Sequence, residues 1–158
     1  MSDSNLLCQG SLGIPVALAS THDMLCAELA QASLAPGRLG IAAKRVNELC
    51  MPHFAKEEED IFRVFGILHD LASERVQPAA ALPLPLLSEL RARRDTSRES
   101  HAAIHSAVDD LLKRALAERN ESIAKLADAL KNHEREEDEV MYPTIISIGQ
   151  SLRQGLRT

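Results

Sequence analysis

The sequence predicts an all-α fold, an antiparallel four-helix bundle with up-down-up-down connectivity. The strong helix formers Ala, Leu, Glu, Arg and Lys dominate the chain, and no stretch sustains the alternation of apolar and polar residues that a strand requires. Breaks rich in proline and glycine divide the 158 residues into four segments, each long enough for one helix of such a bundle.

Each predicted helix begins or ends at a recognisable signal. Pro15 suits the first turn of a helix, and Asn120 is a suitable N-cap. Ala35-Pro36-Gly37 and the proline-rich stretch 78–85 separate the first helix from the second and the second from the third. The expected helices are residues 15–34, 38–73, 85–118 and 121–148.

Two prolines fall inside predicted helices. Pro52 and Pro143 each remove one backbone donor, so each is expected to kink or end its helix. The expected organisation is an N-terminal arm (1–14), one bundle domain (15–148) and a short C-terminal tail (149–158).

Composition excludes several classes of function. The formal charge is −5, Trp is absent, and no apolar run approaches the roughly 20 residues that span a bilayer. Neither nucleic acid nor a membrane is therefore an expected partner. The N-terminus lacks the features of a secretion signal, and the three cysteines include no C-x-x-C pair, so a cytoplasmic location is expected.

Histidines lie on the core-facing stripe of every predicted helix. His22 is spaced 4 and 3 residues from Leu18 and Leu25, and the other stripes carry histidines at the same kind of spacing. One inward histidine is usually an ordinary core residue, but one in every helix calls for a common explanation. The inward histidines are His22, His53, His101, His105 and His133.

Two glutamates share these apolar stripes. Glu57 and Glu137 each follow a histidine by one helical turn, and neither has a Lys or Arg beside it on its stripe. A buried ionised carboxylate costs several kcal/mol unless its charge is compensated. A metal ion would compensate it and would also explain the histidines, since imidazole and carboxylate together suit iron or another first-row divalent metal.

The two halves of the chain resemble copies of one helical hairpin. HFAKEEEDIF (53–62) aligns with HEREEDEVMY (133–142), which matches His53 with His133 and Glu57 with Glu137. Each half is expected to supply ligands to one of two metals, with the carboxylates between them. A ferritin-like site is disfavoured because none of the six histidines has an acid three residues before it.

Four motifs resemble the hemerythrin family, which includes the hemerythrin-like (HHE) cation-binding domains. They are HDML at His22, HFAKEE at His53, ESHAAIH at His101 and HEREEDEVMYP at His133. The resemblance implies a bundle around a di-iron centre with two bridging carboxylates and an oxo or hydroxo bridge; other divalent metals are compatible with the same ligands. The implied metal ligands are His22, His53, Glu57, His101, His105, His133 and Glu137.

The second bridging carboxylate could be Glu137 or Asp138. A residue at i+4 lies about 40° from its partner around a helix and one at i+5 about 140°, so Glu137 is favoured. His101, His105 and His133 are expected on one metal, and His22 with His53 on the other. With five histidines, the family arrangement leaves one coordination position open, at the metal held by His22 and His53.

The expected function is reversible binding of dioxygen, or of a similar diatomic ligand such as nitric oxide, for storage, delivery or sensing, with no catalytic role. The main alternative is an enzyme-like di-iron protein acting on nitric oxide or peroxide, or in repair of iron centres. A third is a bundle in which zinc or manganese is structural. The oligomeric state stays open, with a homodimer as one option.

The remaining acids and one histidine are expected at the surface. His69 is about 160° around the helix from His53 and should face solvent. The acidic residues expected on a charged outer face are Glu58, Glu59, Asp60, Glu134, Glu136 and Glu139.

Overall fold

The protein is built from helices. The computed structural model describes residues 16–72 and 84–155, and most side chains within 20–59 and 88–151. No strand occurs in these described ranges, so the predicted all-α class is confirmed. The elements are α1 (Val16–Ala32), α2 (Gly37–Ala72), α4 (Leu84–Ala117), α5 (Glu121–Glu136), the π-helix η1 (Glu137–Met141) and α6 (Tyr142–Gly155).

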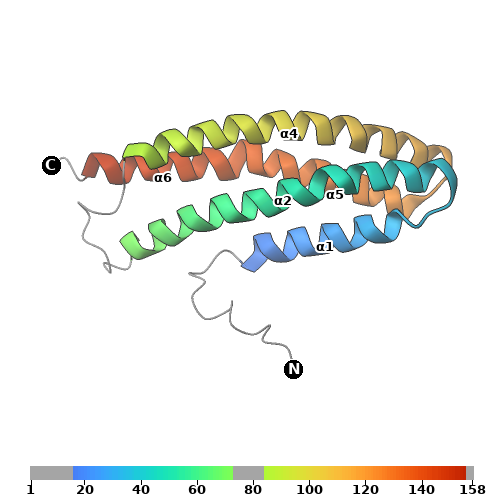
Figure 1. The fold of residues 1–158 in the computed structure, drawn as a ribbon, viewed down its shortest axis with the longest axis horizontal. Coiled ribbons are helices and arrows are strands. Elements are labelled where there is room, and N and C mark those ends of the chain that lie inside the picture. Colours follow the sequence, from blue (N-terminus) through green and yellow to red (C-terminus); the bar gives the residue numbers. More distant parts are fainter. Residues whose placement is uncertain (1–15, 73–83, 156–158) are drawn as a thin grey trace, which may run out of the picture.

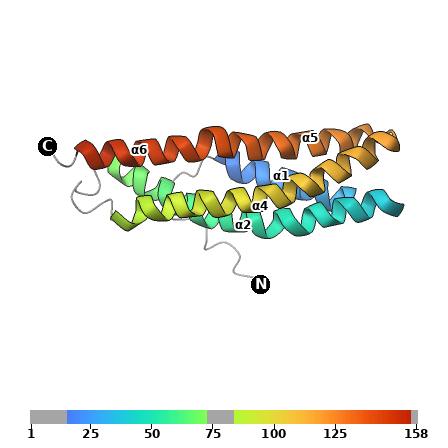
Figure 2. The ribbon, with the colours of Figure 1, turned by 90° about the horizontal axis from the view of Figure 1, so that it is seen from above.

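The helices form a closed ring in which successive helices run in opposite directions (Figure 1). α1 packs against α2 and α5, and α4 packs against the same two helices. α5, η1 and α6 continue one another as a single long rod, and α4 also packs against α6 (Figure 2). None of the described helices has the length and hydropathy needed to cross a bilayer.

The fourth predicted helix begins as expected. The Asn120 side chain accepts a hydrogen bond from the backbone N–H of Ile123 (3.1 Å), which confirms its role as N-cap of α5. Arg119, just before it, has a φ of 54°, and Gly37, at the start of α2, has a φ of 69°. Both tight turns therefore use the left-handed region, which glycine enters more easily than arginine.

The two internal prolines behave differently from each other. α2 continues through Pro52, so the expectation that it ends there is wrong. Pro52 is exposed, and water can therefore hydrate the carbonyl of Glu48 that lost its partner. Pro143 is the second residue of α6, just after η1, whose wider turn interrupts the α-helix. The helix then runs to Gly155, past the expected end at residue 148.

The hydrophobic core fills the part of the bundle next to the α1–α2 and α4–α5 connections. All four main helices contribute to it, with Leu29, Val46, Val108 and Leu130 fully buried. The arm 1–14 and residues 156–158 of the tail lie outside the described residues.

Candidate metal centre

One histidine from each main helix lies at the same level of the bundle, directly above the core. His22, His53, His101 and His133 are 1%, 9%, 2% and 8% exposed. Each histidine has a buried neighbour, at most 1% exposed, three residues away in the sequence. This neighbour follows the histidine in α1 and α4 and precedes it in α2 and α5. The alternation follows from the antiparallel order of the helices. These four side chains form an apolar floor under the histidines: Leu25, Cys50, Ile104 and Leu130.

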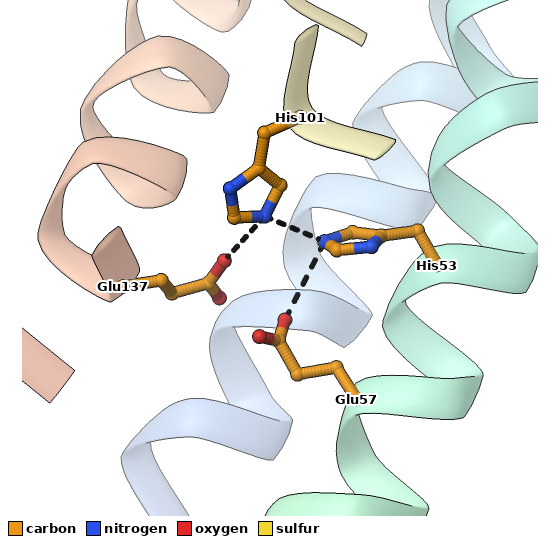
Figure 3. Close-up of side chains that lie close together, drawn as sticks. All are labelled: His53, Glu57, His101 and Glu137. Atoms are coloured by element: carbon orange, nitrogen blue, oxygen red, sulfur yellow. Dashed lines mark hydrogen bonds and ion pairs between the residues drawn. The ribbon is translucent and has the colours of Figure 1, made fainter. Parts of the chain in front are cut away.

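Two histidines and two carboxylates meet in one group that could hold a metal ion: His53, Glu57, His101 and Glu137 (Figure 3). Nε2 of His53 and Nε2 of His101 are 3.0 Å apart. Glu57 Oε2 is 3.6 Å from the first of these nitrogens, and Glu137 Oε2 is 3.4 Å from the second. Ligand atoms from α2, α4 and η1 therefore converge on one point.

A second group shares one of these carboxylates. His22, His133 and Glu137 could hold another ion. Glu137 Oε1 is 2.8 Å from Nε2 of His133 and 3.5 Å from Nε2 of His22. Because its other oxygen faces His101, Glu137 presents one oxygen to each group, as a bridging carboxylate does.

Glu57 also lies between the two groups. Its Oε2 is 3.6 Å from His53 and 3.8 Å from Nε2 of His22. Its Oε1 accepts a hydrogen bond of 2.9 Å from the Tyr142 hydroxyl. Glu57 is 3% exposed and Glu137 is 2% exposed, so both carboxylates are out of bulk water.

The grouping differs from the expected one, in which each half of the chain served one metal. His53 is grouped with His101, and His22 with His133. Each main helix packs against two others, so the helix contacts allow either pairing. The side chains decide it: the ring centroids of His53 and His101 are 4.7 Å apart, and those of His22 and His133 are 4.8 Å apart.

Without a metal, the two glutamates have opposite ionisation preferences. Burial, and then the charge of Glu137, raise the pKa of Glu57 to about 9. Burial alone would also raise the pKa of Glu137, but its interactions with the nearby His101, His133 and His22 outweigh it and lower that pKa. Burial and the neighbouring His101 lower the pKa of His53 to about 4. Without a metal, Glu57 is therefore favoured in its protonated form and Glu137 in its ionised form.

Two further carboxylates hold the outer nitrogens of ligand histidines. His22 Nδ1 donates to Glu58 Oε1 at 2.8 Å, and Nδ1 of His101 is 3.2 Å from Asp138 Oδ2. Such partners fix the ring and the tautomer, which leaves Nε2 free for a metal. Phe54 adds to this by stacking on His22, with ring centroids 4.3 Å apart and planes 7° from parallel.

Two buried oxygens without hydrogen-bond partners indicate that these residues fit a metal ion. Oε2 of Glu57 and Oε2 of Glu137 are buried and have no hydrogen-bond partner among the described residues. Leaving such oxygens unpaired costs roughly 1–3 kcal/mol each, more for a charged group. Cations at the two positions would satisfy them, and imidazole with carboxylate is a donor set that suits iron.

His105 is the one predicted ligand that the structure places in neither group. Its side chain is 37% exposed, and its Nε2 is 3.1 Å from Glu134 Oε2. Its role as a metal ligand stays a prediction. Glu134 itself is 0% exposed, so the expectation that it lies on the charged outer face is wrong. Burial raises the pKa of Glu134 to about 8.

Four residues around the site have roles that the sequence did not predict: Glu58 was expected on the outer face, Asp138 was considered only as a bridging carboxylate, and Ser97 and Tyr142 were given no role. The same hairpin alignment that pairs Glu57 with Glu137 also pairs Glu58 with Asp138, and this was the available signal for the two outer carboxylates. Tyr142 follows Glu137 by five residues, which an α-helix would place on another face. The π-turn of η1, in which the Tyr142 N–H bonds the Glu137 carbonyl, brings both onto one face. Ser97, 8% exposed and 3.2 Å from Nε2 of His101, gave no signal.

Comparison with known proteins agrees with this geometry. The model of the hemerythrin HHE cation-binding domain matches residues 15–145. No curated protein and no solved structure matches the chain. The match includes the helices that carry all six clustered ligands, and the chain therefore belongs to the hemerythrin family of HHE cation-binding domains.

Proposed function

We propose that the protein holds two iron ions at this centre and binds a small ligand, dioxygen or nitric oxide, at the open positions of that pair. One observation carries the proposal. Oε2 of Glu137 faces His101, and Oε1 of Glu137 faces both His22 and His133. A single ion cannot use both sets of ligands when a carboxylate separates them. A pair of ions, bridged by Glu137 and Glu57, uses every buried donor of the cluster.

The charges of the surrounding residues suit two divalent ions. Glu57 and Glu137 lie between the groups, and Glu58 and Asp138 lie behind His22 and His101. These four carboxylates, when ionised, balance two divalent cations. Since an uncompensated charge in a protein interior is costly, this balance favours a pair over a single ion.

The chain supports ligand binding by shielding the site. The apolar floor closes the cluster on its core side, and Phe54 covers His22. Iron at this site would supply the electrons that binding or reducing such a ligand needs. The residues around it hold the imidazoles in place and limit access of water, which strengthens electrostatic interactions within the site.

An enzyme-like role in converting nitric oxide or peroxide is the second candidate. The position of His105 favours it, because a centre with four histidines leaves one more coordination position open than a centre with five. More open positions allow a substrate and a proton-carrying water to be held together. Reversible carriage, in contrast, gains from a site that admits a single ligand.

Metal analysis of anaerobically purified protein, followed by optical spectra during addition of dioxygen, tests the proposal. We expect about two irons per chain and a new absorption band that disappears when dioxygen is removed. A band that decays with consumption of peroxide or nitric oxide would support the enzyme instead. Stoichiometric zinc, with no iron and no spectral response, would contradict both.

A further inference from the structure

A groove between α2 and α4 reaches only one end of the metal centre. Its volume is about 1180 Å³, and among the clustered ligands its wall includes His53 and Glu57 but not His22, His101, His133 or Glu137. Ser97 and Tyr142 line it beside these ligands. A molecule in the groove can therefore approach the centre beside His53 and Glu57, next to Ser97, whose hydroxyl contacts His101.

Ser97 occupies a distinctive place at this end. Glu57 and Glu137 each follow a ligand histidine by four residues, on helices that run in the same direction. α4 runs the opposite way, so its position in the same layer is four residues before His101, which is Ser97. In this layer, α2 and η1 carry the carboxylates of Glu57 and Glu137, whereas α4 carries the short hydroxyl side chain of Ser97.

The hydroxyl of Ser97 lies next to the atom expected to bind metal. Its Oγ is 3.2 Å from Nε2 of His101, and Ser97 is 8% exposed. A metal held by Nε2 would take the lone pair that this hydroxyl faces, so the hydroxyl hydrogen would turn to another acceptor; besides a bound ligand, the Tyr142 hydroxyl oxygen is within its reach. The Tyr142 hydroxyl, in contrast, already donates to Glu57 at 2.9 Å and positions that carboxylate.

We propose that the α2–α4 groove admits the small ligand to the His53–His101 end of the centre and that Ser97 donates a hydrogen bond to it there. This inference rests on the proposed function. The ligand class is a molecule of two or three atoms that carries negative charge when bound, since a hydroxyl donor in a sheltered site stabilises such charge. The groove wall combines apolar residues, such as Ala103 and Ile104, with polar ones, such as Lys56, Glu59 and Thr96.

Azide binding to the oxidised, iron-loaded protein tests the role of Ser97. We expect Ser97→Ala to keep its iron content and to bind azide about tenfold more weakly, which corresponds to the loss of one hydrogen bond to a charged acceptor. The matched control is Ser106→Ala, the same substitution at an exposed position of α4, and it should bind azide as the wild type does. Equal azide affinity in Ser97→Ala and wild type, at equal iron content, would overturn the inference.

A bulky residue in the groove tests the entry route. Ala103→Phe should slow azide association several-fold in stopped-flow measurements, with iron content unchanged, because Ala103 lines the groove. An unchanged association rate would overturn this route. Wild-type protein that holds no iron, or that holds iron and binds no azide, would overturn the inference. Only the failure to hold iron would also overturn the dinuclear iron proposal.

Discussion

Glu137 and Asp138 are neighbours in the chain but have different surroundings. Glu137 is 2% exposed and lies between the two ligand groups, whereas Asp138, whose side chain is 22% exposed, contacts the outer nitrogen of His101. If Glu137 bridges two ions, as proposed, and Asp138 orients one imidazole, the two acids should differ in the cost of their removal.

Glu137→Ala should lose most of its bound iron and melt at a lower temperature than the iron-loaded wild type. Metal binding stabilises the folded state by mass action, so the two losses occur together. Glu139→Ala, an exposed position one residue beyond Asp138, is the control and should change the free energy of unfolding by less than about 0.5 kcal/mol. Metal analysis and thermal melting provide the measurements.

Asp138→Asn should keep its iron and lower the metal affinity by roughly tenfold to a hundredfold, as expected for loss of a partner that orients a ligand. If Asp138→Asn lost iron completely and Glu137→Ala kept it, the assignment of the bridging carboxylate would be reversed.

His105 provides a further test at the level of single residues. Because it contacts Glu134 and lies outside both ligand groups, His105→Ala should retain the iron content of the wild type. His101→Ala, four residues earlier, should lose iron and serves as the matched comparison. Loss of about one iron per chain in His105→Ala would show that a side-chain rearrangement brings His105 to the metal.

At the level of helices, the spacing of apolar residues predicted which side chains face the interior of the bundle. The stripes placed His22, His53, His101 and His133 inward because a helix fixes the direction of every side chain on one face. The position of Tyr142 could not be predicted in this way, since it depends on the π-turn at η1. Glu134 was misjudged because its neighbours Arg135 and Glu136 are exposed and made the segment look like a solvated face.

The sequence pattern also could not predict which helices bring their histidines together. The repeat of two hairpins indicated that His22 belongs with His53, but the folded chain places the ring of His22 against His133 and that of His53 against His101. Periodicity shows which face of a helix is buried and does not show which helix covers it.

Pro52 lies in the interior of α2 at an exposed position, so it offers a prediction about this helix alone. Pro52→Ala should raise the free energy of unfolding by about 1–2 kcal/mol, because alanine restores the missing backbone donor and has the higher helix propensity. Iron content should not change. Thermal melting of the two metal-free proteins is the measurement, and a lower melting temperature for the variant would show that the proline supports a local bend next to His53.

For the whole molecule, the buried charges make the stability of the metal-free protein depend on pH. The pKa of Glu57 is raised to about 9 and that of Glu134 to about 8, against 4.5 in the unfolded chain. The folded state therefore binds more protons than the unfolded state between these values, and stability falls as the pH rises. Burial lowers the pKa values of His22 and His101, but the hydrogen bonds that they donate to carboxylates outweigh it and raise both above 6.5. This adds to the fall in stability above that pH.

The lowered pKa of His53, about 4 against 6.5, acts in the opposite direction but only below pH 6.5. The metal-free protein should therefore lose stability steadily from about pH 6.5 to pH 9. Iron-loaded protein should show a much smaller change, because the ions hold Glu57 in its ionised form and compensate its charge. Melting curves of both forms across this pH range measure the difference. Parallel curves for the two forms would mean that the buried carboxylates are not where the metal binds.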